Sequence, residues 1–456
     1  MEWIDELDRE LSLLREAEAR VRYRADLGGD LDNEELASIA DRRREVLRRP
    51  ETVSKATRLA AGATDPVVRR KAELLRLEII RTRIEDDPEL LALQHELERA
   101  RRAFGEETKT PEGMRSYLKA TEPCARERIC AANRLARRQG FDNYATAKLA
   151  CQEVPISWML KTLSEVHKTF EHDGRRVLAE VDAERLSPQE LDRAVLNRLE
   201  LPTGSFPAED LAASARDTLC AFGISEDGLP IKIEFADLPY PGAVHALEIR
   251  RDIRVVMNEP KGGFHERALL FHELGHALYY AYVPDSVLLL DSRVGREGLA
   301  ELWAGLIERR EWLRWFSDMT DAEIGELLEK RRRWHAYLMM TLVQWTRFDL
   351  ELYRNPEADF RDVWNVVTRD CLGIDNRTGI YPDFVFLYPL DIKDYVIAHL
   401  IREAVMGELE RRFGTDLMNA DVFGFIVKSC YETGNLVPWH KRLLGLDELA
   451  VSQHRS

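Results

Sequence analysis

A pair of histidines four residues apart, inside a long apolar run, constrains the fold of this chain more than any other feature. His272 and His276 enclose Glu273 in the pattern His-Glu-x-x-His, and the run from Ala268 to Tyr280 is mostly apolar. Such a run predicts a buried helix. Residues four apart on a helix share one face, so both imidazoles can bind one metal ion, with Glu273 beside it. This pattern is typical of zinc metalloproteases, in which the glutamate is the general base.

A third ligand is needed, because a catalytic zinc site combines three protein ligands with one open position. Residues 296–303, Arg-Glu-Gly-Leu-Ala-Glu-Leu-Trp, are helical in pattern and place Glu297 and Glu301 on the same face. We expect Glu297 to complete the site and Glu301 to accept the N–H of a ligand histidine, which would fix its ring orientation. Two alternatives stay open. Glu301 could be the ligand with Glu297 in support, or the histidines could be core residues and the glutamates part of a solvated helix face.

The motifs HELGHALYY at 272–280 and REGLAEL at 296–302 resemble those of zinc peptidases whose third ligand is a glutamate on a second helix. Thermolysin-like, angiotensin-converting-enzyme-like and thimet-oligopeptidase-like enzymes, the last including oligopeptidase F, share this plan. In these families an acid or amide follows the third ligand by one helical turn, which favours Glu297 as the ligand. The resemblance extends from Pro239 to a stretch from Gly434 to Trp439. It implies one Zn²⁺ per chain and the hydrolysis of peptide bonds.

Composition excludes several classes of function. The 456 residues include 66 basic and 81 acidic ones, a net charge of −15, which disfavours nucleic-acid binding because phosphate contacts dominate that affinity. The first residues form no signal peptide, and no apolar run is long enough to span a membrane. The six cysteines are scattered, which indicates reduced core thiols rather than a disulfide framework. We therefore expect a cytoplasmic protein with a peptide or peptide-like substrate as its partner.

Helical periodicity dominates the chain and predicts a mainly α fold. Residues 1–110 read as successive helices, which we interpret as a lid or outer wall with little chemistry of its own. Residues 111–456 form the predicted catalytic domain, again mostly helical. Together they should make two helical halves around a deep cleft. Short alternating segments at about 230–257 predict a small mixed sheet beside the zinc helix.

The predicted sheet suggests how a substrate would lie. Zinc peptidases of this plan bind substrate along an edge strand, where main-chain pairing supplies binding energy. His245 and Ala246 fall within the sheet, and a similar His-Ala pair lies on the substrate strand of angiotensin-converting enzyme. By this resemblance both residues are candidates for substrate binding. The alternative for His245 is an ordinary half-buried histidine.

Late tyrosines are candidates for a catalytic role, because the oxyanion formed during peptide hydrolysis needs a donor besides the metal. The converting-enzyme and thimet-oligopeptidase families place such tyrosines near the start of a late helix. That resemblance assigns the oxyanion to Tyr395 and a place in the cleft to Tyr388. The converting-enzyme family grips the substrate terminus with a lysine and a histidine, whose positions hold Asp383 and Val385 here. What would hold the terminus in this chain is therefore open, with Lys393, Arg293 and Arg296 as possible substitutes.

The sequence favours a zinc peptidase that acts on short flexible peptides, of the oligopeptidase or dipeptidyl-carboxypeptidase kind. In this interpretation a zinc-activated water attacks the scissile carbonyl, Glu273 is the general base and Tyr395 stabilises the oxyanion. The alternative is a zinc-dependent amide hydrolase or tailoring enzyme for one specialised small molecule or precursor peptide, which the residues at 383 and 385 motivate. A non-catalytic helical binding module is disfavoured, because a binding module has no need of Glu273.

Overall fold

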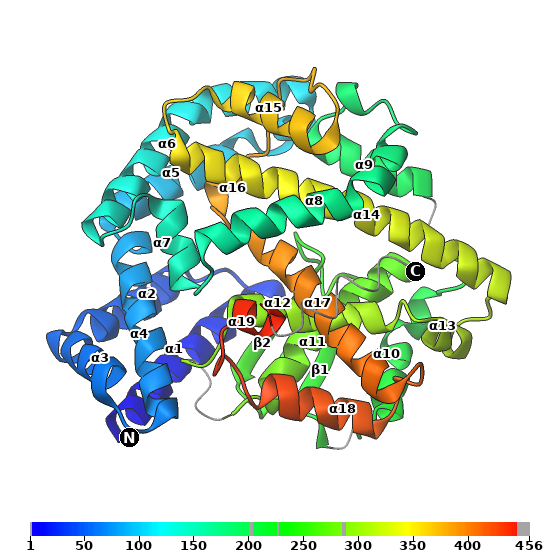
Figure 1. The fold of residues 1–456 in the computed structure, drawn as a ribbon, viewed down its shortest axis with the longest axis horizontal. Coiled ribbons are helices and arrows are strands. Elements are labelled where there is room, and N and C mark those ends of the chain that lie inside the picture. The colour runs from blue at the N-terminus through cyan, green and yellow to red at the C-terminus, as the bar shows by residue number, and fades with distance from the viewer. Residues whose placement is uncertain (1, 200–203, 226–227, 285–288, 445–456) are drawn as a thin grey trace. The chain divides into compact units, whose positions relative to one another are not determined.

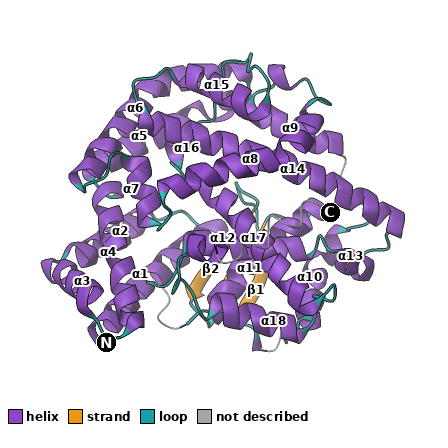
Figure 2. Cartoon of the chain, viewed as in Figure 1, coloured by secondary structure: helices purple, strands orange, loops and turns teal. Residues whose placement is uncertain are grey.

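The computed structural model describes residues 2–199, 204–225, 228–284 and 289–444 (Figure 1). Helices make up most of this part of the chain, and the strands are confined to one small sheet (Figure 2). The predicted mainly α fold with a small mixed sheet is therefore confirmed. No helix in the described ranges has both the length and the apolarity that crossing a membrane requires.

The chain divides into two compact units, each built from separate stretches of sequence. Unit 1 comprises residues 1–76, 201–328 and 397–456, and unit 2 comprises residues 77–200 and 329–396. Three helices contain a boundary between the units: α4 (Pro66–Glu85), α14 (Asp321–Arg354) and α17 (Ile392–Phe413). The expected lid at residues 1–110, the catalytic domain at 111–456 and the deep cleft between helical halves stay predictions.

Unit 1 contains the predicted zinc helix and the sheet. Its helices are α1 (Glu2–Asp26), α2 (Asn33–Arg48), α3 (Pro50–Gly62), α10 (Leu211–Ala221), α11 (Phe264–Tyr282), α12 (Arg293–Leu306), α13 (Arg310–Phe316), α18 (Ala420–Ile426) and α19 (Trp439–Leu444). Its strands are β1 (Ile231–Phe235), β2 (Gly242–Glu248) and β3 (Asp252–Met257). The strands lie where the alternation at 230–257 predicted them.

The sheet has the order β1-β3-β2, so β2 lies at one edge. β1 runs parallel to β3, with Ile231 opposite Ile253, and β2 runs antiparallel to β3, with Val244 opposite Val255. Ile253, Val255 and Val256 of β3 are fully buried, as expected for the central strand of the sheet. β2 and β3 also pack against α11, so the sheet lies beside the predicted zinc helix.

Helix α1 covers the free edge of β2. The backbone N–H of Ile249 donates to Glu16 at 3.0 Å, and Arg20 donates to the carbonyl of Leu247 at 2.5 Å. Edge strands expose unpaired backbone groups, and a covering helix is one way to satisfy them. The N-terminal helix is therefore bound to the strand that the sequence assigned to substrate.

Aromatic side chains pack behind the predicted zinc helix, α11. Phe271 of α11 contacts Trp312 edge to face, with 5.7 Å between ring centroids. The indole N–H of Trp312 donates to Thr218 at 2.9 Å, and that of Trp303 donates to Tyr431 at 2.7 Å. Both tryptophans are fully buried. Their paired N–H groups fix the orientation of the core on which α11 and α12 rest.

In the described residues of unit 2, all regular secondary structure is helical. Its helices are α5 (Pro88–Phe104), α6 (Pro111–Arg138), α7 (Tyr144–Cys151), α8 (Ile156–Leu178), α9 (Pro188–Leu199), α15 (Phe360–Leu372) and α16 (Phe384–Leu387). α5 packs against α6, and α8 against α15. All six cysteines of the chain are free; Cys371 and Cys430 are buried, but Cys220 is exposed, so the prediction of core thiols is wrong at Cys220.

Candidate metal centre

Helix α11 directs both motif histidines at one carboxylate oxygen. Nε2 of His272 lies 3.6 Å and Nε2 of His276 lies 3.5 Å from the same Oε2 of Glu297 on α12. Among the described residues, these three form the group of side chains whose ligand atoms, all within 4.8 Å of one another, could hold a metal ion. Ligands placed tetrahedrally at about 2.0–2.1 Å from zinc lie roughly 3.4 Å apart. The spacing of the three donor atoms therefore fits a zinc ion.

Close packing of α11 on α12 brings the donors together. A Cβ atom on Gly275 would lie only 2.6 Å from the Cα of Ala300 and 3.1 Å from the carbonyl oxygen of Leu299. Glycine lets two backbones approach in this way because it has no side chain. The helix contact lies one residue before His276, so it sets the distance between the histidines and Glu297.

Glu301 lies one turn after Glu297 and contacts the other nitrogen of a histidine. Its Oε1 is 3.2 Å from Nδ1 of His272, and its Oε2 is 3.7 Å from Nδ1 of His399 on α17. The structure thus places Glu297 between both motif histidines and Glu301 behind one of them. This geometry matches the preferred assignment of ligand and support, and the roles themselves stay predictions.

The centre is electrostatically polarised. Burial lowers the pKa of His272, but Glu297 and Glu301 outweigh burial and raise that pKa well above its ordinary value. Burial raises the pKa of Glu297, and the histidines outweigh it, so the pKa of this carboxyl falls well below its ordinary range. The pKa of Glu301 is also lowered, because His399 and His272 outweigh its burial. Both acids are therefore carboxylates at neutral pH, the form that binds a cation or orients a ligand.

The side chain of Glu273 reaches the sheet, and its charge also acts on His272. A Cβ atom on Gly242, the first residue of β2, would lie 3.3 Å from the Cγ of Glu273. The charge of Glu273 also acts on His245 further along the same strand. The predicted general base therefore lies between the metal ligands and the edge strand.

His245 and Ala246 lie on β2 as predicted, and both are buried. Nε2 of His245 is 2.7 Å from a carboxylate oxygen of Asp26, at the end of α1. Burial lowers the pKa of His245, although Asp26 opposes this shift. Whether either residue contacts substrate stays a prediction, but Asp26 shows that His245 already has a partner from α1.

The predicted tyrosines belong to unit 2. Tyr388 is exposed, and its ring lies 4.8 Å from that of Phe384. Tyr395 is on the first turn of α17, directly after the buried Asp394. Their roles in the oxyanion site and the substrate cleft stay predictions. At the positions of the absent clamp, Asp383 is buried in an ion pair of 3.1 Å with Arg101, and Val385 is buried.

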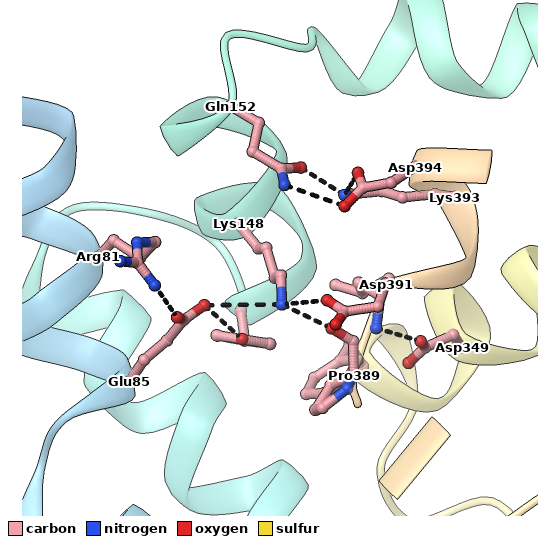
Figure 3. Close-up of polar contacts among 12 residues, drawn as sticks. Arg81, Glu85, Lys148, Gln152, Asp349, Pro389, Asp391, Lys393 and Asp394 are labelled. Carbon is pink, nitrogen blue, oxygen red and sulfur yellow. Dashed lines mark hydrogen bonds and ion pairs between the residues drawn. The ribbon is translucent and has the colours of Figure 1, made fainter. Parts of the chain in front are cut away.

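A buried polar network, which sequence reasoning missed, holds the segment before Tyr395 (Figure 3). Lys148 of α7 donates to the carbonyl of Pro389 and to Asp391, each at 2.8 Å. Lys393 donates to Asp394 at 2.5 Å and also contacts Gln152. The only sequence signal for this network is the alternation of charges in Asp-Ile-Lys-Asp at 391–394. It fixes the start of α17 within unit 2.

A second missed group surrounds Tyr280, one turn beyond His276 on α11. Its hydroxyl accepts from Arg15 of α1 and from Arg296 of α12, each at 2.5 Å. Both arginines also pair with Asp291. The four-residue spacing of Tyr280 from His276 could have predicted that the tyrosine lies near the metal centre. No local signal links Arg15 to Tyr280 or Asp291, which are more than 260 positions away.

Comparison with solved structures identifies the fold. The crystal structure of an M32 carboxypeptidase from Deinococcus radiodurans R1 is similar with a TM-score of 0.71 and 13% identity, over 99% of this chain and 96% of that chain. The structure of a protein named CHT is similar with a TM-score of 0.69 and 14% identity, over 99% and 96%. No family model and no curated protein matches the sequence. The chain thus has the fold of an M32 carboxypeptidase, and the expected kinship with the converting-enzyme and thimet-oligopeptidase families is not confirmed.

Proposed function

We propose that this protein is a zinc-dependent peptidase that hydrolyses peptide bonds in short, flexible peptides. The observation that carries the proposal is the convergence of His272, His276 and Glu297 on one point, with Glu273 beside them. Two neutral imidazoles and one carboxylate are a donor set typical of catalytic zinc, and three protein ligands leave a position for substrate or water. The fold of an M32 carboxypeptidase supports the same activity.

Zinc, when bound, would act as a Lewis acid and lower the pKa of a coordinated water to about 7. Side chains of the protein would orient the ligands and transfer the protons. Glu301 holds the ring of His272 through its Nδ1, so that Nε2 faces the ligand position. Nδ1 of His276 has no hydrogen-bond partner among the described residues. The ring of His272 is therefore oriented by a polar contact, and the ring of His276 by packing alone.

Glu273 is proposed as the general base. It accepts a proton from the attacking water and returns it to the leaving amine, a role that contributes a factor of about 10²–10⁴. Its place next to Gly242 of β2 would put the carboxylate beside a peptide bound along the strand. Tyr395 is proposed as the donor to the oxyanion, on the strength of sequence resemblance alone.

The direction of cleavage is proposed from the fold. The similar protein from Deinococcus radiodurans is a carboxypeptidase, which favours the removal of residues from the C-terminus of a peptide. This differs from endo-cleavage by an oligopeptidase and from the release of dipeptides. The positions of the dipeptide clamp hold a buried Asp383 and a buried Val385, which also argues against dipeptide release.

The test is a Glu273→Gln variant assayed on a mixture of peptides, with product masses and zinc content measured together. We expect the natural protein to hold one zinc and to shorten peptides. The variant should keep its zinc and lose at least about 10²-fold in kcat. Stoichiometric loss of zinc in the variant, or full activity, would overturn the role of Glu273. A natural protein with intact zinc and no cleavage would favour an amide hydrolase for one specialised molecule.

A further inference from the structure

His399 of α17 is a buried histidine to which the proposed function gives no role. It is 4% exposed, and its Nδ1 lies 3.7 Å from Oε2 of Glu301. The residue belongs to the part of α17 in unit 1, the unit that also contains α12 and the candidate metal centre. The packing and the charges around Glu301 favour a role in that centre over the role of an ordinary core histidine.

Helix α17 packs directly on the face of α12 that carries Glu301. A Cβ atom on Gly298 would lie 2.6 Å from the Cβ of Ile401, and one on Gly305 would lie 2.7 Å from Nε of Arg402. Gly298, Glu301 and Gly305 share one face of α12, with the glutamate between the glycines. Because glycine has no side chain, α17 can approach α12 closely on either side of Glu301. This approach places His399 against the carboxylate.

Each carboxylate oxygen of Glu301 faces a different imidazole. Oε1 is 3.2 Å from Nδ1 of His272, within hydrogen-bonding range, and Oε2 is 3.7 Å from Nδ1 of His399, somewhat beyond that range. The side chain of Glu301 is 16% exposed. A carboxylate that is mostly removed from water needs donors for its oxygens, because it loses its hydration there. His399 is placed to supply a donor to the second oxygen.

The charges of His399 and Glu301 favour each other. Burial raises the pKa of Glu301, and among the groups that lower this pKa His399 has the largest effect, ahead of His272. Burial lowers the pKa of His399, and Glu301 opposes that shift. In the neutral ring as in the charged one, the nitrogen that faces a carboxylate carries the proton. We therefore assign an N–H group to Nδ1 of His399.

Arg402, the other basic group of α17 near Glu301, has acidic partners of its own. Its guanidinium donates to Glu308 at 2.6 Å and lies 3.4 Å from Glu403. Two carboxylates thus balance its charge, and it acts on Glu301 less strongly than His399 does. The structure therefore gives α17 a contact within 4 Å of Glu301 through His399.

We propose that His399 is a positioning residue of the metal centre, which holds the carboxylate of Glu301 so that Glu301 in turn orients His272. This inference rests on the proposed zinc site. A polar partner fixes the orientation of a ligand histidine only if the partner is itself held in place. The position of Glu301 matters here because Nδ1 of His276, the other ligand histidine, has no hydrogen-bond partner among the described residues.

The test measures the Zn²⁺ affinity of the full chain by competition with a coloured chelator, which needs no turnover. His399→Leu removes the donor and keeps a large buried side chain. We expect it to weaken zinc binding about 3- to 10-fold, less than the loss of a direct partner of a ligand histidine. His399→Asn should retain the natural affinity, because the amide nitrogen of asparagine takes the place of Nδ1. This rescue separates a donor from a residue that only fills space.

A double-mutant cycle tests whether His399 acts through Glu301. In the Glu301→Ala background, His399→Leu should have no further effect on zinc affinity, because the group through which it acts is gone. Co²⁺ in place of zinc gives a second readout, since its visible spectrum depends on the geometry of the ligands. His399→Leu and Glu301→Ala should shift this spectrum in the same direction, and His399→Asn should leave it unchanged.

Leu409→Ala is the control for a loss of packing in α17. Leu409 is fully buried and lies about 15 Å beyond His399 along the helix. This variant should lower the Tm and leave zinc affinity unchanged. Unchanged affinity in His399→Leu, equal losses in His399→Leu and His399→Asn, or additive losses with Glu301→Ala overturn the proposal. If His399→Leu does not fold, His399→Gln takes its place, because its amide nitrogen corresponds to Nε2 rather than Nδ1.

The two proposals fail separately. Zinc binding that depends on His399, in a protein that cleaves no peptide, keeps the positioning role and overturns the peptidase function. Peptide cleavage by a protein whose zinc affinity is the same in His399→Leu keeps the peptidase and overturns the positioning role. A natural protein without affinity for zinc overturns both.

Discussion

We propose that Glu301 acts on a metal that it does not bind. It contacts His272 through Nδ1 and leaves Nε2 free to face the ligand position. We expect Glu301→Ala to lower zinc affinity about 10- to 100-fold, because the ring loses its orientation and basicity. Competition with a coloured chelator measures this. Glu311→Ala, a change on α13 in the same unit, should leave zinc affinity unchanged, and equal affinities in all three proteins would contradict the role of Glu301.

Asp349 is a residue whose ionisation should oppose folding. It is 1% exposed, and burial raises its pKa to about 7, although the N–H of Leu390 and the charge of Lys148 oppose this shift. A carboxyl with a raised pKa in the folded state binds its proton more tightly there. Its contribution to stability is present at low pH and is lost as pH rises from its ordinary value toward 7.

Asp349→Asn should therefore stabilise the protein more at pH 8 than at pH 5, by roughly 1–3 kcal/mol. Urea unfolding at the two pH values measures the difference. Asp370→Asn, on the exposed surface of the same unit, should change stability equally at both. An equal change in stability at pH 5 and pH 8 would show that Asp349 is ionised without cost.

At the scale of elements, the contact of α11 with α12 determines the geometry of the metal centre. A methyl group at Gly275 would meet backbone rather than a flexible side chain, so the helices must separate. We expect Gly275→Ala to cost about 1–3 kcal/mol of stability and to weaken zinc binding, because Glu297 moves away from the histidines. Thermal unfolding and zinc titration measure the two effects.

Gly424 of α18 provides the control for this change. A Cβ atom there would find no atom within 4 Å. Gly424→Ala should therefore be neutral or stabilise the protein by up to about 1 kcal/mol, because alanine favours a helix. Equal effects at 275 and 424 would mean that helix propensity, rather than the close approach, decides.

The elements themselves were largely predictable, and their long-range partners were not. Alternation at 230–257 predicted the three strands, and the four-residue spacing of His272 and His276 predicted a common helix face. Both signals are local. We expected residues 1–110 to contribute little chemistry, and the sequence did not predict the contacts made by α1. Asp26 of this helix contacts His245, and Arg15 contacts Asp291. Such contacts depend on packing between distant segments, which no local periodicity encodes.

At the scale of the whole molecule, metal binding should be visible as stability. A ligand that binds only the folded state stabilises it by about 4 kcal/mol at a thousand times its Kd. We expect a chelator to lower the Tm and one equivalent of Zn²⁺ per chain to restore it. His276→Ala should have a Tm that neither treatment changes. A restored Tm that required several equivalents, or a response in His276→Ala, would contradict a single site at this centre.

The way in which α1 covers β2 has a practical consequence for anyone who wishes to shorten the chain. Deleting residues 1–26 would strip Glu16 and Arg20 from the backbone groups of Ile249 and Leu247. A bare strand edge invites pairing with other copies of itself. The shortened protein would then accumulate as insoluble aggregate during expression. A fusion tag should therefore not be attached to a chain from which the first helix has been removed.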